Sequence, residues 1–388
     1  MNSTSADKVL RALPKNGEFG AGSAIGLRYA KIRAELTDLG LYDRDSLIML
    51  RDGAGRVVLD CYGRRVSPDV FGEIQAELAV LTSGKYSKAY SRRNRAVKAS
   101  NDDMAMMFGY KVSRTESAGP GTIACLIRDR GFIVTARFPS ELIAACILME
   151  KMCKTEILSH HIGRVHHLNP VLSAVGHRVY MTKYSKKARE ASEADAAAGN
   201  NNAPAEISDL ALREAVIEYG KLLVENRLIQ ATWGNVSVRI DDDRFLITPS
   251  GVNYDLIKPE EIVEIRVDDG SYAEGLRPSS ERILHRLVYK ERPDIKAIIH
   301  THSSNCQVFA ACHEPLKTGG IDYPCAEYGM SGSAKLAENV AAVMANHDGC
   351  IMANHGFVAG DVSLAAALER AKQAEEAAGR ILGDVSID

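Results

Sequence analysis

The sequence predicts an α/β fold, with a strand-rich centre flanked by helices in its C-terminal half. Apolar residues recur at helical spacing in LREAVIEYGKLLVENRL and again in SLAAALERAKQAEEAAGRIL, near the end of the chain. Between these helices lie short apolar runs rich in β-branched residues, such as NVSVRI and IKAIIHTH, which are typical of strands. No GxGxxG motif occurs, so we expect an α/β sandwich and not a doubly wound nucleotide-binding sheet.

The elements of this half follow one another in a clear order. A helix is expected over 212–228, and two strands over 235–240 and 244–249 around an aspartate-rich turn. PSSERILHRLVYKERP predicts a helix that begins with a serine cap, and IKAIIHTH then predicts a buried strand. GCIMANHGFVAG predicts two further short strands before the closing helix.

The chain is long for one domain. Its 388 residues predict two. Residues 185–206 are rich in small and charged side chains, contain Gly-Asn-Asn-Asn-Ala-Pro and lack an apolar face, which indicates a linker. We therefore expect an N-terminal domain over 1–184 and a C-terminal domain over 207–388.

Composition excludes several classes of partner. The hydrophobic content of 46% and charged content of 25% are ordinary for a globular protein. A formal net charge of -2 predicts neither a nucleic-acid nor a membrane partner. No apolar run approaches the roughly 20 residues of a membrane helix. The eight cysteines form no CxxC pair and the N-terminus has no apolar signal region, so we expect a cytoplasmic protein with reduced thiols.

Two histidines in IIHTHS are candidate metal ligands. Residues two apart in a strand point to the same face, so His300 and His302 project together while Thr301 faces the other side. Imidazoles so placed can bind one Zn²⁺ at about 2.0–2.1 Å per nitrogen. Taken alone, the same pair also fits hydrogen-bonded histidines of a core or a surface.

A third histidine strengthens the metal hypothesis. His355 ends an apolar run directly before Gly356, where a glycine permits close backbone approach or a positive φ. Three histidines that leave a coordination position open are typical of a catalytic metal site. By contrast, His285 is interpreted as a packed or capping residue, and His313 and His347 as loop residues.

A carboxylate and a candidate anion pocket accompany the histidines. Glu281 falls in the first turn of a predicted helix, where an acid also simply complements the helix dipole. Hydroxyls and N–H groups at helix starts and strand ends can together bind a phosphate, although each such residue alone fits an ordinary turn. The candidate phosphate-binding residues are Gly234, Asn235, Ser250, Gly251, Ser279 and Ser280.

With these motifs in view, the sequence resembles the class II aldolase/adducin family. GNVSVR, FLITPSG, RPSSERILHRLVY, IIHTHS and ANHGFVAG occur in the family's order between residues 207 and about 382. The resemblance implies a central β-sheet flanked by helices, and a homo-oligomer, usually a tetramer, with active sites between subunits.

The resemblance also implies roles for individual residues. The metal ligands fall on His300, His302 and His355, and the catalytic acid/base falls on Glu281. The phosphate pocket falls on the six candidate phosphate-binding residues. Zn²⁺ is the expected cofactor, although imidazole also accepts Mn²⁺ or Co²⁺.

The implied activity is that of a carbon–carbon lyase of carbohydrate metabolism. A ketose 1-phosphate would be cleaved to dihydroxyacetone phosphate and an aldehyde through a Zn²⁺-stabilised enediolate. Glu281, with a raised pKa, would move the proton at the enediolate carbon. Tyr323 and Tyr328 are present, but neither aligns with the family's proton-donating tyrosine.

Other members of the family leave alternatives open. Its sugar-phosphate 4-epimerases typically carry aspartate at the position of Glu281, which favours aldol cleavage here. Its decarboxylases use the same three histidines and stay an alternative. A non-catalytic, adducin-like scaffold would have lost its metal ligands, and all three are present.

The first half is interpreted as a degenerate copy of the second, or else as an unrelated α/β domain. CLIRDRGFIVTA parallels CIMANHGFVAGD, which matches Gly131 with Gly356 and places Arg130 where the second half has His355. Neither PSSE nor HTH occurs in the first half. Two features there have other candidate roles: the histidines of SHHIGRVHHLNP in metal binding, and the basic run 85–98 in binding a phosphate or an acidic partner. Solvated side chains also explain both.

Overall fold

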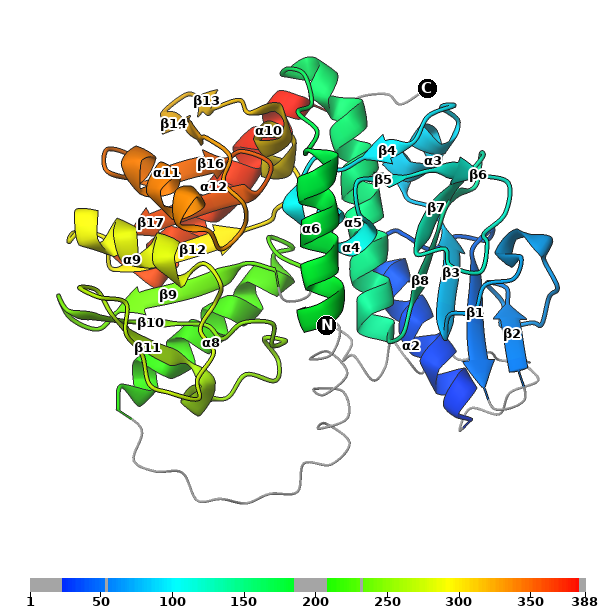
Figure 1. Cartoon of the computed structure of the whole chain (residues 1–388), viewed down its shortest axis with the longest axis horizontal. Helices are drawn as coiled ribbons and strands as arrows, with labels where there is room; N and C mark the ends of the chain where they lie inside the picture. Colours follow the sequence, from blue (N-terminus) through cyan, green and yellow to red (C-terminus); the bar gives the residue numbers. More distant parts are fainter. Residues whose placement is uncertain (1–22, 53–54, 185–207, 231–232, 384–388) are drawn as a thin grey trace. The chain divides into compact units, whose positions relative to one another are not determined.

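The computed structural model describes residues 23–52, 55–184, 208–230 and 233–383 (Figure 1). The expected linker over 185–206 lies outside the described residues. The chain divides into two compact units, each with a large sheet of its own. The N-terminal unit consists of the described parts of Met1–Ala99 and Met107–Ile157, and the C-terminal unit of Ser100–Met106 and Leu158–Val385. Of the expected N-terminal domain over 1–184, the short segment 100–106 and residues 158–184 therefore belong to the C-terminal unit.

The C-terminal unit is built on a seven-stranded sheet with the order β11-β10-β9-β12-β17-β16-β15. Neighbouring strands are antiparallel except β15 and β16, which are parallel. The strands are β9 (Asn235–Arg239), β10 (Arg244–Ile247), β11 (Val263–Arg266), β12 (Ala297–Thr301), β15 (Cys325–Ala326), β16 (Gly349–Met352) and β17 (Gly356–Asp361). All five residues of β12 are buried, as expected for a strand in the middle of a covered sheet.

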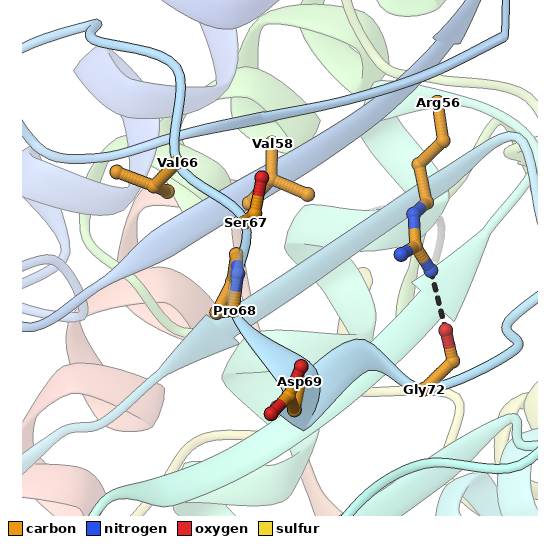
Figure 2. A pocket seen from close by; sticks show the side chains of 7 residues that line it. All are labelled: Arg56, Val58, Val66, Ser67, Pro68, Asp69 and Gly72. Carbon is orange, nitrogen blue, oxygen red and sulfur yellow. Dashed lines mark hydrogen bonds between the residues drawn. The ribbon is translucent and has the colours of Figure 1, made fainter.

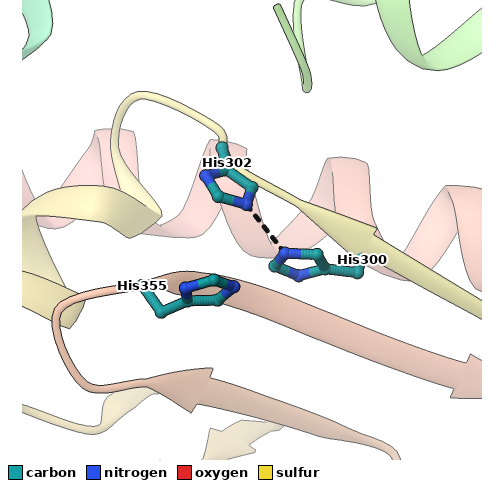
Figure 3. Close-up of side chains that lie close together, drawn as sticks. All are labelled: His300, His302 and His355. Carbon is teal, nitrogen blue, oxygen red and sulfur yellow. Dashed lines mark hydrogen bonds between the residues drawn. The ribbon is translucent and has the colours of Figure 1, made fainter. Parts of the chain in front are cut away.

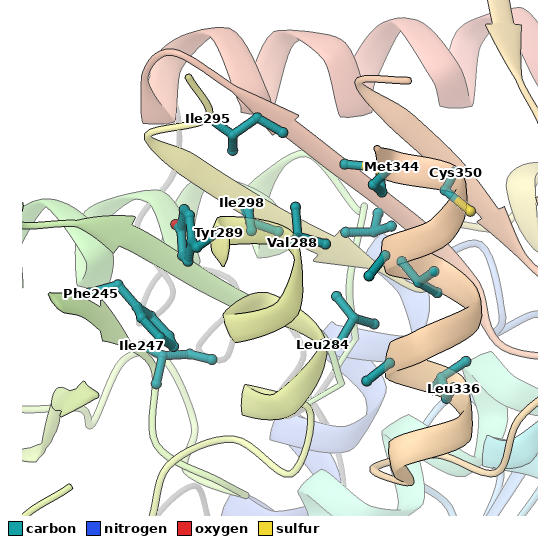
Figure 4. Close-up of a cluster of buried hydrophobic side chains, with 14 of the residues drawn as sticks. Phe245, Ile247, Leu284, Val288, Tyr289, Ile295, Ile298, Leu336, Met344 and Cys350 are labelled. Atoms are coloured by element: carbon teal, nitrogen blue, oxygen red, sulfur yellow. The ribbon is translucent and has the colours of Figure 1, made fainter. Parts of the chain in front are cut away.

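Helices cover this sheet. They are α8 (Leu210–Glu225), α9 (Arg282–Glu291), α10 (Cys306–Cys312), α11 (Ala334–Met344) and α12 (Leu364–Leu382). Leu284 and Val288 of α9 pack with Met344 of α11 against sheet residues that include Ile298 (Figure 4). Side chains alternate along a strand, so Ile299 points to the other face, where α12 contacts β12 and β17. The expected sheet flanked by helices is confirmed.

Smaller elements complete this unit. They are the 3-10 helices Ser159–His161 and Pro259–Glu261, α6 (Pro170–Val179), the π-helical turn Tyr180–Tyr184, and the hairpin of β13 (Leu316–Thr318) and β14 (Ile321–Tyr323). The start of α9 differs from expectation, because Glu281 occupies the N-cap without a side-chain cap bond. The hydroxyl of Ser279 accepts a hydrogen bond from the Glu281 N–H (3.3 Å), so the serine precedes the helix instead of capping it.

The N-terminal unit contains a six-stranded sheet with the order β2-β1-β3-β8-β7-β6. Its elements are α2 (Ala24–Asp38), β1 (Leu47–Asp52), β2 (Gly55–Leu59), the 3-10 helix Asp69–Phe71, β3 (Leu78–Thr82), α3 (Lys85–Ser91), β4 (Val97–Lys98), β5 (Lys111–Val112), β6 (Arg114–Thr115), β7 (Ala124–Ile127), β8 (Gly131–Ala136) and α5 (Pro139–Leu158). Helix α4 (Asp102–Phe108) starts in the segment that belongs to the C-terminal unit. The basic run 85–98 covers α3 and β4.

The two sheets share their strand order over six strands. Each neighbouring pair of strands has the same relative direction in both sheets when β2-β1-β3-β8-β7-β6 is aligned with β10-β9-β12-β17-β16-β15. The last pair is parallel in both. Thr82 pairs with Phe132 as Thr301 pairs with Phe357. A Cβ on Gly131 or on Gly356 would collide with the carbonyl oxygen of the matching threonine.

This register identifies what the N-terminal unit carries at the three histidine positions. Leu81 matches His300, Ser83 matches His302, and Arg130 matches His355. Leu81 belongs to an apolar cluster with Met49 and Ile133. The N-terminal sheet thus has no imidazole at any of these three positions.

Three further features concern surfaces and thiols. A pocket in the N-terminal unit has one cationic side chain in its lining, Arg56, whose guanidinium donates to the carbonyl oxygen of Gly72 at 2.5 Å (Figure 2).

All eight cysteines are free thiols, and seven are buried. Among the described helices, none has both the length and the apolar character that spanning a bilayer requires.

Candidate active site

Three segments of the C-terminal unit meet at one end of its sheet. His300 lies in β12 and His302 just beyond the end of that strand, while His355 lies in the turn between β16 and β17. Because Thr301 pairs with Phe357, the residue after Thr301 comes to lie beside this turn. Glu281 joins them from the start of α9. These four side chains are at most 5% exposed.

The three imidazoles face one another (Figure 3). The Nε2 atoms of His300 and His302 are 2.8 Å apart, and the ring centroid of His355 lies 5.0 Å and 4.9 Å from theirs. One ring nitrogen from each histidine lies within 4.8 Å of the other two. Within the described residues, this is the one group of three or more histidine, cysteine or acidic side chains with metal-binding spacing.

The ring nitrogens fit a divalent transition metal. The Nε2 atom of His355 is buried and has no hydrogen-bond partner among the described residues. Glu281 Oε1 lies 2.6 Å from it, an ion-pair distance when the ring is protonated. A buried imidazole nitrogen without a hydrogen bond, next to two others, is suited to donating its lone pair to a cation such as Zn²⁺.

The opposite ring nitrogen of each histidine is held by an oxygen. The Nδ1–H of His300 donates to the carbonyl of Phe357 at 2.9 Å. The Nδ1 atom of His302 lies 2.5 Å from Asp103 Oδ2, and that of His355 lies 3.0 Å from Asp102 Oδ2. The 2.8 Å hydrogen bond between the Nε2 atoms of His300 and His302 needs a proton on one of them. If a cation displaces that proton while each Nδ1 keeps its own, all three Nε2 atoms offer lone pairs on the side where the rings converge.

Asp102 and Asp103 were not predicted from the sequence. They follow Asn101, whose side chain accepts from the Met104 N–H at 2.8 Å, so SNDD has the ordinary pattern of a capped helix start. They are separated from their histidines by 253 and 199 residues. No local signal in the sequence connects the two regions.

Glu281 is held by a chain of buried polar side chains. Asn235 donates from Nδ2 to Glu281 Oε2 at 2.8 Å, and its Oδ1 accepts from His285 Nε2 at 2.5 Å. The Nδ1 atom of His285 bonds Ser237 Oγ (2.7 Å), which in turn bonds the Tyr289 hydroxyl (2.8 Å). If His285 is neutral and donates from Nε2, its Nδ1 accepts from the Ser237 hydroxyl, and every member of the network has a partner.

The pKa of His285 agrees with a neutral ring in that network. Burial lowers the pKa of His285 to about 4, although Glu281 opposes the shift. Burial also lowers the pKa of His300, to about 3. The pKa of Glu281 departs from the raised value that was expected. Burial raises it, but His300 and His355 outweigh burial and hold the pKa well below its usual range. Burial alone would lower the pKa of His355, but the negative charges of Glu281 and Asp102 raise it well above its usual value.

The six candidate phosphate-binding residues lie on adjacent segments. Pro249 bridges to Pro278, and the Ser279 N–H donates to the Thr248 carbonyl at 3.0 Å, which brings the turn after β10 beside the start of α9. The Ser250 N–H is likewise bonded to the Arg277 carbonyl at 3.0 Å. Gly234 and Gly251 have φ of 100° and 75°.

These residues differ in how accessible they are. Ser280 and Gly251 are exposed, whereas Asn235 is 4% exposed and directs its amide to Glu281. Since two of the backbone amides are already bonded, a phosphate here would depend more on hydroxyls than the sequence suggested.

The remaining candidate residues have varied surroundings. His285 is fully buried, as expected of a packed residue. His313 caps the end of α10 and its ring stacks on His166 at 4.1 Å. Tyr323 is buried and packs against Phe357, with ring centroids 5.1 Å apart. The Tyr328 hydroxyl donates to Asp102 Oδ1 at 2.9 Å.

A mixed sheet with three buried histidines and a buried carboxylate at one end defines an α/β protein with a candidate metal centre. Known proteins similar to this chain cover the same unit. The family model described as "Class II Aldolase and Adducin N-terminal domain" matches residues 214–382. L-fuculose phosphate aldolase from Escherichia coli O157:H7 is 36% identical over 168 residues, which are 41% of this chain and 77% of that protein.

Further relatives are also aldolases. 5-Methylthioribulose-1-phosphate/5-deoxyribulose-1-phosphate aldolase from Rhodospirillum rubrum is 34% identical over 179 residues, covering 44% of this chain and 80% of that protein. A solved structure of L-fuculose 1-phosphate aldolase has a TM-score of 0.43 at 36% identity, over 45% of this chain and 86% of that chain. The protein belongs to the class II aldolase and adducin family.

Proposed function

We propose that the protein is a divalent-metal-dependent aldolase that cleaves a ketose 1-phosphate into dihydroxyacetone phosphate and an aldehyde. The observation that carries the proposal is the convergence of three buried imidazole nitrogens, one without a hydrogen bond, beside the buried carboxylate of Glu281. A histidine triad with an acid at its centre suits proton abstraction next to a carbonyl that a cation polarises.

Each group has a role in this proposal. His300, His302 and His355 hold the cation, which when bound would polarise the carbonyl and neighbouring hydroxyl oxygens of the substrate. In the condensation direction, ionised Glu281 takes a proton from the hydroxymethyl carbon of dihydroxyacetone phosphate, and in cleavage it returns one to that carbon. Because its pKa is lowered, Glu281 is ionised at neutral pH, the form that can take up a proton. Asn235 holds this carboxylate through a bond of 2.8 Å.

The phosphate is assigned to the residues of the predicted pocket other than Asn235. Ser250, Gly251, Ser279 and Ser280, next to Gly234, would contact it on adjacent segments at the start of α9. The activities of the relatives support a phosphorylated sugar as substrate, with L-fuculose 1-phosphate and 5-deoxyribulose 1-phosphate as the first compounds to test. Zn²⁺ as the metal, a homotetramer and a cytoplasmic location belong to the same proposal.

We also propose that the N-terminal unit is a degenerate copy of the catalytic one. The shared strand order, the matching register and the equivalent glycines support this. With Leu81, Ser83 and Arg130 at the ligand positions, the copy would bind no metal in this manner. Metal analysis of the full chain should then find one tightly bound equivalent, and two equivalents would contradict the proposal.

The activity is tested by following release of dihydroxyacetone phosphate from a panel of ketose 1-phosphates, with and without chelator. We expect release from one or more members, lost with chelator and restored by Zn²⁺, Mn²⁺ or Co²⁺. Glu281→Gln should retain the metal and lose turnover by a factor of about 10² or more. Metal-loaded protein that releases the product from no member of the panel would refute the proposal.

A further inference from the structure

Two carboxylates from the first half of the sequence contact two of the three histidines. They lie in Ser100–Met106, the segment that belongs to the C-terminal unit. Asp103 Oδ2 is 2.5 Å from His302 Nδ1, and Asp102 Oδ2 is 3.0 Å from His355 Nδ1. The aspartate side chains are only 2% and 8% exposed. The family model, which matches residues 214–382, includes neither of them.

The segment that carries these carboxylates is bonded to the turn that carries His355. The Asp102 N–H donates to the Asn354 carbonyl at 3.0 Å, and Asn354 Nδ2 donates back to the Ser100 carbonyl at 2.8 Å. Asn354 can form this turn because it adopts a left-handed conformation, with φ of 53°. The segment and the turn are thus joined by a pair of bonds, which fixes Asp102 relative to His355.

The second oxygen of Asp102 is also used. Tyr328 donates its hydroxyl to Oδ1 at 2.9 Å, while Oδ2 faces His355. A carboxylate bonded at both oxygens cannot rotate without breaking one bond. The imidazole of His355 is therefore presented in one orientation, with Nε2 toward the other two rings.

We propose that Asp102 and Asp103 are positioning residues of the metal site, which hold His355 and His302 as Nδ1–H tautomers and direct their Nε2 lone pairs to the cation. His300 is held in the same way by a backbone carbonyl. This inference rests on the proposed metal site and extends it to residues outside the family domain. It also gives the first half of the sequence a role in the chemistry of the second.

A purely structural role does not explain this pair. Two adjacent buried carboxylates repel each other and lose hydration, which makes them costly unless positive charge compensates them. An asparagine at either position has the same size and could accept the one hydrogen bond from the histidine Nδ1–H without that cost. With Glu281, the two aspartates bring three acidic side chains to three imidazoles, a balance that suits a dication at the centre.

The first test measures zinc affinity of the full chain by competition with a chromophoric chelator. Asp102→Asn and Asp103→Asn should each weaken zinc binding by about 10- to 100-fold. Asp322→Asn is the charge control, since Asp322 is exposed and pairs with Lys317 at 3.3 Å, and its affinity should stay within twofold of wild type. Aspartate variants that fold as wild type and bind zinc within twofold of it would overturn the proposal.

The second test uses the unmodified protein, so it does not depend on a variant that folds. After labelling with ¹⁵N-histidine and loading with ¹¹³Cd²⁺, the metal should couple to three Nε2 nitrogens, while protons stay on the Nδ1 atoms of His302 and His355. Coupling at either Nδ1 would overturn the proposal, because that nitrogen could not then donate to an aspartate. Failure of ¹¹³Cd²⁺ to bind any histidine would overturn the metal site as well.

The two proposals can therefore fail separately. Coupling at Nε2 and weakened zinc binding in the aspartate variants, without cleavage of any sugar phosphate, would refute the aldolase activity and leave the positioning role intact. If the protein is an active aldolase and the aspartate variants keep wild-type zinc affinity, the positioning role is refuted and the aldolase activity stands.

Discussion

Replacing Asn235 by alanine separates two roles that its position allows. Sequence pattern assigns Asn235 to the phosphate pocket, whereas the structure directs its side chain to Glu281 Oε2 at 2.8 Å and to His285 Nε2 at 2.5 Å. The substitution would leave a buried carboxylate short of one donor and a buried imidazole short of its acceptor. A hydrogen bond to a charged group contributes about 1.5–3 kcal/mol, and an unsatisfied buried donor costs about 1–3 kcal/mol.

Together these losses predict a decrease of about 4 kcal/mol in the free energy of unfolding. Urea denaturation of the chelator-treated protein at about pH 8 measures it. Tyr289→Phe is the matched control, because it removes only the hydroxyl that bonds Ser237 (2.8 Å), further from Glu281 in the same network. The control should lose about 1 kcal/mol.

Kinetics then distinguish the two roles of Asn235. If it orients Glu281, Asn235→Ala should slow proton exchange on dihydroxyacetone phosphate by about tenfold or more, with KM changed little. If it binds phosphate, KM should rise instead with kcat preserved. A raised KM, together with a stability loss no larger than that of Tyr289→Phe, would refute the reasoning.

Three further predictions follow from the same structure. His285 has a pKa of about 4 in the folded protein, below its unfolded value of about 6.5. The unfolded chain therefore takes up the proton first as pH falls. The free energy of unfolding should decrease by about 3 kcal/mol between pH 6.5 and pH 4. Comparing the pH dependence of unfolding of wild type and His285→Gln checks this, and parallel curves would contradict it. In Gly356→Ala the new Cβ would collide with the Thr301 carbonyl and lie 3.1 Å from His300 Cε1, so zinc affinity should fall at least tenfold. Gly131→Ala, its counterpart in the N-terminal unit, should destabilise that unit and leave zinc affinity unchanged; equal zinc loss in both would argue against a local effect. Finally, Leu284→Ala in the core between α9 and the sheet should cost about 3 kcal/mol, measured by urea unfolding, and a loss below about 1 kcal/mol would contradict the packing.

Much of the fold of the C-terminal unit can be predicted from local sequence patterns. The alternation in IIHTH places His300 and His302 on one face, and the glycine after His355 is required because a Cβ would collide with the Thr301 carbonyl. Gly356 has no positive φ, so close approach and not backbone conformation is the reason for a glycine here. These interactions lie within single strands or between neighbouring ones, where side-chain periodicity is informative.

Other features depend on tertiary structure. Asp102 and Asp103 are indistinguishable in sequence from the acids of any capped helix, and only the fold brings them to His355 and His302. The pKa of Glu281 was expected to rise because burial alone raises it, but the nearby histidines reverse the sign. Asn235 fits both a phosphate pocket and a buried network, and its 4% exposure favours the network.

The most direct test of the central claim is solvent deuterium exchange into dihydroxyacetone phosphate, because it does not require the aldehyde to be known. Zinc-loaded protein in D₂O should incorporate one deuterium at the hydroxymethyl carbon, and the exchange should disappear with chelator and in Glu281→Gln. No exchange by zinc-loaded protein, or exchange that survives loss of the Glu281 carboxylate, would contradict a metal site of three histidines that acts with Glu281 as its base.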